Sequence, residues 1–381
     1  MASLRTRYVP ALAFLVCLEL SILLPARADV LRVSPDSPAI LPSILPAADD
    51  TNINFPSIIA VPPWLRARGA LGAYYMYFSS HKGAHVRVAY ADSVEGPWTV
   101  HPNGTDITLD RVAAVNNDSY DPAKGHTASP EAWVDPAAYQ VRMYYHFRLL
   151  GLGHQAGYAY SEDGLHWSLT PGAVHPRPYL RRFVLPNVGH GPGGAGGEYM
   201  IDRDLGVYRV VTKDQFSGRP MAFELVNRLL GNVLANLSLI NGDGETGLVR
   251  HVGVDLLPNP LAPTSVRVYA TRIGDAPERI VATRVALRDC ALPVAACLYR
   301  DPSHWAATEA VEVLRPATFH EGAGEPVVPS AKGDGPAYRV NQLRDPAPYY
   351  DAGSGRHYLA YAIGGEFGIA LAQLTGADIE P

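Results

Sequence analysis

Apolar and polar residues alternate along this chain in paired runs, and the pairs recur. The clearest pair reads YYMYFSSHKGAHVRVAYADSVEGPWTV over residues 74–100. It returns as VRMYYHFRLLGLGHQAGYAYSEDGLHWSL over residues 141–169. Each run is rich in Tyr, Val and Phe, and a Gly-containing turn joins the two runs, as in a β-hairpin. We therefore predict that both segments fold as hairpins.

Weaker copies of the same unit occupy residues 198–214, 266–287 and 357–374. Hairpins that recur at a spacing of tens of residues are typical of radial repetition around an axis. Counting five units, we predict an all-β fold, a five-bladed β-propeller that forms one domain over residues 29–381. The Pro-rich residues 29–50 are expected to wrap the outside before the first strand.

The segments that precede four of these hairpins are unusually polar for buried strands. They begin at Ile53, His126, Leu248 and Asn341. In a propeller the first strand of each blade lines the central channel, and one mouth of the channel usually holds the site. Three of the segments contain an X-Pro step, which suits a strand start or edge. This pattern places five polar side chains near the channel mouth: Asn54, Ser129, Glu131, Arg344 and Asp345.

Residues 1–28 have the features of a secretory signal. Arg5 and Arg7 precede an apolar run, and Ala26-Arg27-Ala28 provides a small-x-small cleavage site. A membrane anchor is disfavoured because the run is short and contains Glu19. We expect cleavage after Ala28, a secreted product and no membrane partner after cleavage.

Charge and cysteine content narrow the function classes further. The chain has a formal net charge of −5, and the signal would remove a net +2, which leaves about −7. Such a balance argues against a nucleic-acid partner, which needs a basic face. Cys17 would leave with the signal, and the remaining pair, Cys290 and Cys297, is expected to form a local disulfide in an exported chain.

Short motifs give the chain a family resemblance. Arg344-Asp345-Pro346 followed by 358–361 (YLAY), the segment 128–131 (ASPE) and Glu321-Gly322 resemble blade motifs of the five-bladed propeller glycoside hydrolases. That group includes families 43, 32, 68 and 117, and the resemblance covers most of the chain after the signal. It implies hydrolysis of a glycosidic bond in a polysaccharide or oligosaccharide by a monomeric enzyme.

The resemblance also implies roles for individual residues. Glycoside hydrolysis uses two carboxyl groups, one as proton donor and one as base or nucleophile. By resemblance Glu321 is the general acid and Asp345 the base, with Glu131 in support, and the inverting members of the group are the most similar. Substrate-binding side chains are expected at the channel mouth: Asn54, His126, Arg250, His251 and Arg344.

One position departs from the group's pattern. The first blade usually provides an Asp-Pro base, whereas this chain has Asn54-Phe55-Pro56. An amide cannot act as a general base, so two alternatives stay open. The protein could be a carbohydrate-binding propeller without catalysis, or a polysaccharide lyase that uses Tyr or His chemistry.

Histidines are prominent in the same segments, at positions 81, 85, 126, 146, 154 and 251. The resemblance would allow a calcium ion beside a channel histidine. No HExxH, CxxC or EF-hand spacing is present, however, so we expect no metal and no cofactor, with the histidines hydrogen-bonded to neighbouring hydroxyls.

Overall fold

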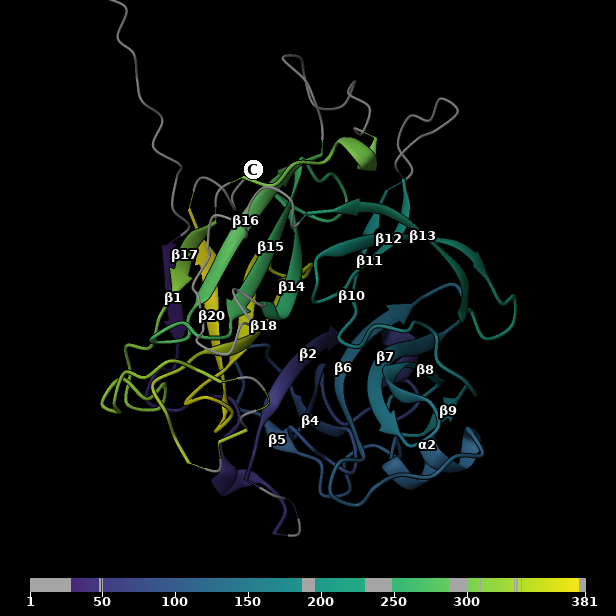
Figure 1. Cartoon of the computed structure of the whole chain (residues 1–381), viewed down its shortest axis with the longest axis horizontal. Helices are drawn as coiled ribbons and strands as arrows, with labels where there is room; N and C mark the ends of the chain where they lie inside the picture. The colour runs from purple at the N-terminus through teal and green to yellow at the C-terminus, as the bar shows by residue number, and fades with distance from the viewer. Residues whose placement is uncertain are drawn as a thin grey trace, which may run out of the picture.

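Five four-stranded antiparallel sheets make up the molecule (Figure 1). The computed structural model describes residues 29–47, 49, 51–186, 196–229, 249–287, 301–308, 310–331, 333, 335–336 and 338–376. The sheets are the blades of a five-bladed β-propeller, which confirms the predicted fold class. The predicted signal and the Cys290–Cys297 disulfide lie outside the described residues.

Each blade runs outward from the strand nearest the axis, with its strands in chain order except at the closure of the ring. Blade 1 consists of β2 (Asn54–Ala60), β3 (Tyr74–Ser79), β4 (Arg87–Ala91) and β5 (Thr99–Val100), and blade 2 of β6 (His126–Asp135), β7 (Gln140–Leu149), β8 (Gly153–Ser161) and β9 (Trp167–Leu169). Blade 3 consists of β10 (Arg181–Leu185), β11 (Gly197–Ile201), β12 (Gly206–Lys213) and β13 (Pro220–Arg228), and blade 4 of β14 (Val249–Leu257), β15 (Ser265–Arg272), β16 (Ile280–Ala286) and β17 (Val311–Leu314). Blade 5 consists of β18 (Arg344–Asp351), β19 (Arg356–Ala362), β20 (Ile369–Thr375) and β1 (Asp29–Val33). The described helical segments are short: η1 (Pro42–Ile44), α1 (Pro63–Arg66), α2 (Leu109–Val115) and η4 (Pro302–His304).

The ring closes through strand β1, which pairs antiparallel with β20. In this pairing Val30 lies opposite Leu374, and Arg32 lies opposite Ala372. Our expectation that residues 29–50 only wrap the outside is therefore wrong for 29–33. Because β1 comes from the start of the chain and β18–β20 come from its end, this pairing joins the two ends of the ring, and β1 becomes the outer strand of blade 5.

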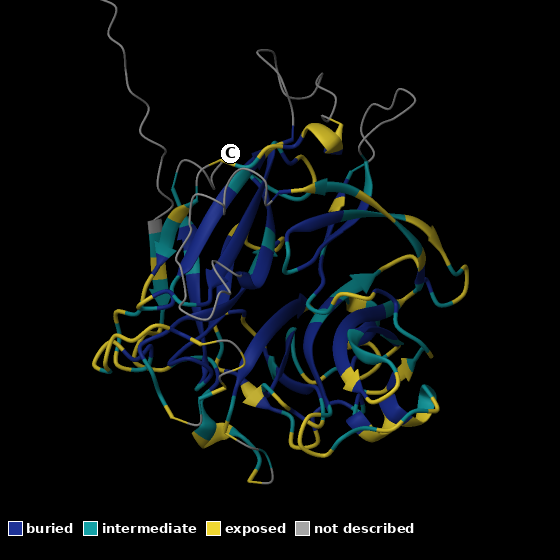
Figure 2. Ribbon diagram, viewed as in Figure 1, coloured by how far each residue is buried: buried dark blue, intermediate teal, exposed yellow. Residues whose placement is uncertain are grey.

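Apolar side chains pack between neighbouring blades rather than in one central core. Figure 2 shows that the buried residues lie along the strands of the blades. Among the described residues, each pair of adjacent blades shares a buried cluster. Trp98 packs between blades 5 and 1, and Trp167 packs between blades 1 and 2. Both indoles are buried, as expected of packing residues. The two-residue period of each strand sends alternate side chains to the two faces, so each face contributes to a different cluster.

The X-Pro steps mark bulges in the inner strands. Phe55, Ser129 and Asp345 all have positive φ angles, of 55°, 51° and 51°. The strand register shifts at each of them, in β2, β6 and β18. β14 shifts register between Val249 and Val252 without a proline. Because a bulge bends a strand and changes the direction of its side chains, these shifts aim polar groups at the axis.

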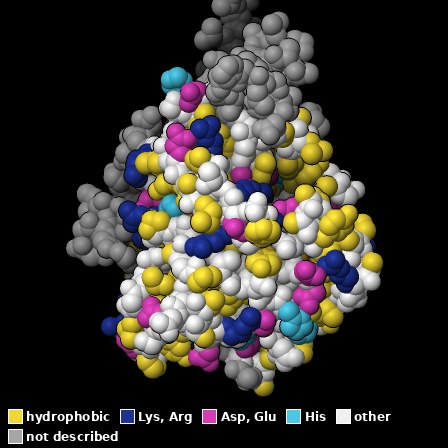
Figure 3. Space-filling model, turned by 90° about the vertical axis from the view of Figure 1, so that its right-hand side faces the viewer, with side chains coloured by type: hydrophobic (Ala, Val, Ile, Leu, Met, Phe, Trp, Pro, Cys, Tyr) yellow, Lys and Arg dark blue, Asp and Glu magenta, His cyan; other side chains and the backbone are white. Residues whose placement is uncertain are grey.

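The outer surface differs from the axis in its charge pattern. On the side formed by blades 2 and 3, acidic and basic side chains are interspersed (Figure 3). No described helix is long and apolar enough to cross a membrane.

Candidate functional site

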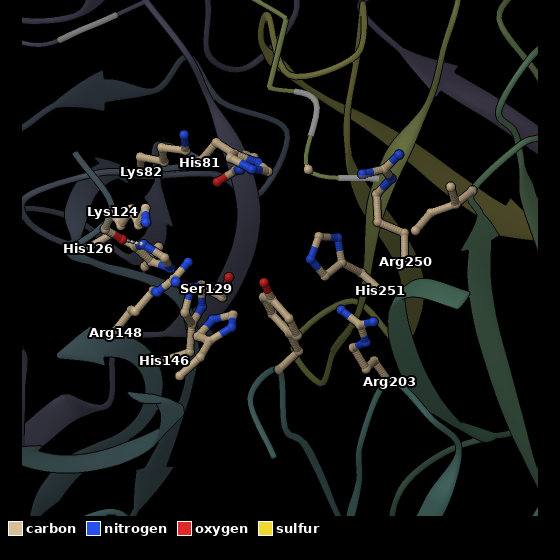
Figure 4. A pocket seen from close by; sticks show the side chains of 16 residues that line it. His81, Lys82, Lys124, His126, Ser129, His146, Arg148, Arg203, Arg250 and His251 are labelled. Atoms are coloured by element: carbon tan, nitrogen blue, oxygen red, sulfur yellow. Dashed lines mark hydrogen bonds between the residues drawn. The ribbon is translucent and has the colours of Figure 1, made fainter. Parts of the chain in front are cut away.

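A cavity of about 370 Å³ lies at one end of the propeller axis (Figure 4). A second cavity, of about 390 Å³, is lined by residues 46–120 alone. Side chains from four blades and from the β17–β18 connection meet in the first one, which we call the axial cavity. Its lining comprises Asn54, His81, Lys82, Lys124, His126, Ala128, Ser129, His146, Arg148, His154, Tyr179, Arg203, Arg250, His251, Ile273 and Gly333.

Hydrogen bonds connect the bulges of neighbouring blades beneath this cavity. The Ser79 hydroxyl donates to Asn54 Oδ1 at 2.9 Å and accepts from the backbone N–H of Ser129 at 3.1 Å. The Asp345 carboxylate accepts from the backbone N–H of Phe55 at 3.2 Å. Blades 5, 1 and 2 are therefore fixed relative to one another at the axis, which holds the lining side chains in place.

His251 is backed by a carboxylate. Its Nδ1 contacts Asp345, which is fully buried, and its ring packs against Phe55 and Tyr179 at centroid distances of 4.6 Å and 4.7 Å. Burial lowers the pKa of His251 below 6.5, and the charge of Asp345 offsets this only in part. His251 is thus neutral at neutral pH, and with Nδ1–H directed at Asp345 its Nε2 is a proton acceptor.

His81 is also backed by a carboxylate, with the opposite outcome. Its Nδ1 lies 3.2 Å from the buried carboxylate of Glu366. Asn52 holds both residues, because its amide donates to Glu366 at 2.8 Å and its carbonyl oxygen accepts from the His81 backbone N–H at 2.7 Å. Burial opposes protonation of His81, but the hydrogen bond and charge of Glu366 outweigh it and raise the pKa of His81 above 6.5.

A buried charge network connects the residues beneath the cavity. Arg344 is fully buried and forms ion pairs with Glu366 at 2.9 Å and with Glu278 at 3.2 Å. Glu278 also pairs with Arg250, with the guanidinium Nε 2.9 Å away. Buried charges need such partners, because an isolated one carries a desolvation penalty of several kcal/mol.

Three histidines of blade 2 form another part of the lining. The ring centroids of His126, His146 and His154 lie 4.8–5.2 Å apart. Among the described residues, no carboxylate is recorded as hydrogen-bonded to any of them. Burial lowers the pKa of His126 to about 4 and that of His154 to about 3, and lowers the pKa of His146 well below 6.5.

The cavity is rich in cations. Five lysine and arginine side chains line it, and no Asp or Glu is among its described lining residues. The five are Lys82, Lys124, Arg148, Arg203 and Arg250. Since clefts lined by one sign of charge concentrate ligands of the opposite sign, this site favours an anionic ligand.

The structure brings most of the predicted site residues to one place. Four of them line the axial cavity, namely Asn54, His126, Arg250 and His251. Arg344 and Asp345 lie directly beneath, in contact with Glu366 and His251. Their predicted catalytic and binding roles stay predictions.

The other two predicted residues do not line the cavity. Glu131 pairs with Arg181 and accepts from the backbone N–H of Arg182 at 3.2 Å. Glu321 is buried, and its carboxylate accepts from Arg32, from the Tyr361 hydroxyl and from two backbone N–H groups. With four donors around it, Glu321 has the surroundings of a structural carboxylate.

Several residues in or beneath the cavity were not among the predicted site residues. Glu366 looks like a hairpin-turn residue in Gly364-Gly365-Glu366, yet it is fully buried beside Arg344. Tyr179 and Arg203 lie in connections of blade 3, where the sequence gives no repeat signal. The sequence could have pointed to the blade 2 residues, because His146 and Arg148 are two residues apart on one strand of a predicted hairpin and so share a face.

Comparison with known proteins agrees with the fold. The chain superposes on a putative glycoside hydrolase from Parabacteroides distasonis with a TM-score of 0.52 at 11% identity, covering 93% of this chain and 98% of that one. It superposes on an endo-arabinase from Bacteroides thetaiotaomicron with a TM-score of 0.51 at 11% identity, covering 90% and 98%. No family model matches the sequence.

The chain therefore has the five-bladed propeller fold of these two proteins, and the predicted resemblance is confirmed at the level of the fold. Uncharacterized protein R118 of Acanthamoeba polyphaga mimivirus is 36% identical over 334 residues, which span 86% of this chain and 84% of that protein. The chain belongs to the same family as R118.

Proposed function

We propose that the protein is a secreted enzyme that hydrolyses glycosidic bonds of an acidic glycan in the axial cavity. One observation carries this proposal, namely that two cavity histidines have carboxylate partners but opposite pKa shifts. Titratable groups whose surroundings push their pKa values apart are the usual acid–base pair of an active site. The glycoside-hydrolase-like fold supports the choice of substrate class.

The two histidines suit complementary steps. His251 Nε2 would accept a proton from the water that attacks the anomeric carbon. His81, protonated and held by Glu366, would donate a proton from Nε2 to the glycosidic oxygen as the carbon–oxygen bond breaks. An acid and a base that act on opposite faces with a water between them give inversion of configuration. Inversion is therefore part of the proposal, with His81 in the role that the family resemblance gives to Glu321.

The cationic lining supports an acidic substrate. Arg148 and Arg203 lie on opposite sides of the cavity (Figure 4). Guanidinium groups bind carboxylate and sulfate oxygens through paired hydrogen bonds, and they keep their charge at all relevant pH values. Uronate-containing and sulfated glycans are therefore the first substrates to test.

A reducing-sugar assay over acidic and neutral glycans tests the proposal. The wild type should release reducing ends from an acidic glycan, and His81→Gln and His251→Gln should each lower kcat about 10²–10⁴-fold. His304→Ala, which changes an exposed histidine outside the cavity, is the control. Glycan binding without turnover would favour the non-catalytic alternative, and wild-type activity in both variants would refute the assignment.

A lyase is the second candidate, because Tyr179 packs against His251 at 4.7 Å and a Tyr–His pair can remove a proton next to a uronate carboxylate. Elimination leaves an unsaturated uronate that absorbs in the ultraviolet, whereas hydrolysis does not. Ultraviolet-absorbing product in step with reducing-end release would replace hydrolysis with elimination.

N-terminal sequencing of exported material tests secretion, since the sequence should begin at Asp29.

A further inference from the structure

The three blade 2 histidines converge because of strand register. His126 on β6 lies opposite Arg148 on β7, and Arg148 lies opposite His154 on β8. His146 is two residues from Arg148, so it points to the same face of the sheet. The four side chains therefore share one face, and that face borders the axial cavity.

The ring nitrogens of this trio are close enough to share one ligand. One nitrogen from each of His126, His146 and His154 lies within 4.8 Å of the other two. Zinc–nitrogen bonds of about 2.0–2.1 Å place tetrahedral ligands about 3.3 Å apart, so closure by about 1.5 Å at most would complete the geometry.

Hydrogen bonding in the trio is incomplete in a way that points to a missing ligand. His146 is only 3% exposed, and neither of its ring nitrogens has a hydrogen-bond partner among the residues that the structure describes. Within the same residues, His154 Nε2 is also buried without a partner. An unsatisfied buried polar atom costs about 1–3 kcal/mol, which a bound cation would offset.

His126 is oriented as a metal ligand would be. Its Nδ1 lies 2.8 Å from the carbonyl oxygen of Lys124. A carbonyl only accepts, so Nδ1 carries the hydrogen and Nε2 offers a lone pair. Metal-binding histidines are usually fixed in this way, through the ring nitrogen that does not bind the metal.

We propose that His126, His146 and His154 bind a divalent transition metal of the zinc type, with one coordination position open to the axial cavity. Three neutral imidazoles suit zinc and its neighbours better than calcium or magnesium, which prefer oxygen ligands. Arg148 and Lys124 beside the trio favour an anion at the open position.

This inference departs from the expectation that no metal is bound, which rested on linear motifs. The trio matches no such motif because His146 and His154 lie on the two strands of a hairpin, where His154 is opposite Arg148, rather than along one helix. It is also independent of the proposed glycan chemistry, since metal binding can be measured without a substrate.

Calorimetric titration of chelator-treated protein with zinc chloride tests the site. The wild type should bind one zinc ion per chain, and His126→Ala and His154→Ala should each weaken binding by at least about 10–100-fold, the loss seen when even an outer-shell partner is removed. The Co²⁺-loaded wild type should show the visible absorption of a four-coordinate ion, and both variants should lose it.

Two controls accompany this test. His304→Ala should keep the zinc site because His304 does not line the cavity, and Cys290→Ser/Cys297→Ser should keep it because the three proposed ligands are histidines. His154→Gln replaces His154→Ala if circular dichroism shows that His154→Ala is unfolded. No zinc binding by the wild type, unchanged binding in the histidine variants or loss of binding in the cysteine variant would each overturn the proposal.

Discussion

The axial cavity contains the same residue type in two different surroundings. His81 and His251 each contact a buried carboxylate, Glu366 or Asp345. The blade 2 trio has no carboxylate hydrogen-bond partner among the described residues, and its nitrogens lie close to one another. Figure 4 shows His126 and His146 across the cavity from His251.

The hydrogen-bond partners of a histidine in this cavity, rather than the residue type, decide its role. Burial disfavours the charged imidazole in both sets of histidines. A carboxylate opposes that effect strongly at His81 and weakly at His251, which leaves one proton donor and one acceptor. Without a carboxylate, the trio stays neutral and keeps its lone pairs for a ligand.

Removal of Arg344 should have the largest effect. Arg344→Ala leaves Glu278 and Glu366 without a shared cation in a dry site, and breaking such buried pairs costs about 3–5 kcal/mol. Urea denaturation should show this loss of unfolding free energy. Arg356→Ala, which removes an exposed ion pair with Glu95, should leave the urea midpoint unchanged. Equal midpoints for both variants would mean that the network does not support the site.

Asp345→Asn should sharpen the assignment of the proton acceptor. An asparagine oxygen can still accept from the Phe55 backbone N–H, but it no longer stabilises a charged His251. We expect kcat to fall about 10²–10⁴-fold with little change in KM. Asp345 raises the pKa of His251, so its removal should lower that pKa. The rising limb of the pH profile of any remaining activity should therefore lie at a lower pH than in the wild type. An unshifted profile would remove Asp345 from this role.

The pH profile of the wild type follows from the same pair. His251 must be neutral, so the rate should rise with pH below 6.5; His81 must be protonated, so the rate should fall again above 6.5. We expect a bell-shaped plot of kcat/KM against pH. His81→Gln should abolish the falling limb. A profile that rises without limit would exclude His81 as the acid.

Glu321→Gln separates the structural from the catalytic interpretation of that residue. A glutamine can replace only one carboxylate oxygen, so one set of donors loses its acceptor at a cost of about 1–3 kcal/mol. Stability should fall while turnover per folded molecule stays the same. Glu224→Gln, in an exposed pair with Arg209, is the matched control. A fall in kcat without loss of stability would restore Glu321 as the general acid.

The smallest expected effect is on acid stability. Burial opposes ionisation of Glu366, but the His81 hydrogen bond and the Arg344 charge lower its pKa. Ionised Glu366 therefore stabilises the folded state above the usual glutamate pKa, and this contribution is lost as the pH falls toward the lowered value. Glu366→Gln should flatten the decline of the urea midpoint below pH 5. An identical slope in variant and wild type would contradict the shift.

The sequence was sufficient to predict the blades, because alternation and turns are local properties. The inner strand of blade 3 was not predicted, since β10 is only five residues long and carries Arg181 and Arg182. The N-terminal strand was missed because nothing local shows that β20 needs a partner. Pairing across the whole chain decides both.

The site was less predictable for the same reason. Proline steps located Asn54, Ser129 and Asp345 on inner strands, but the bulges that aim them depend on register with the next strand. The burial of Glu366 depends on Arg344, with which it packs only in the folded ring. Register arguments could have found the blade 2 trio, because a hairpin over 141–169 places His146, Arg148 and His154 on one face.

The claim that carboxylate partners separate the cavity histidines into two sets is tested most directly by a pH titration of their ring nitrogens. The titration uses ¹⁵N nuclear magnetic resonance on metal-free protein. Single substitutions at His81, His126 and His154 assign the signals. We predict that His81 titrates above pH 6.5, His126 near pH 4 and His154 near pH 3. Titration of all three together near pH 6.5 would contradict the account.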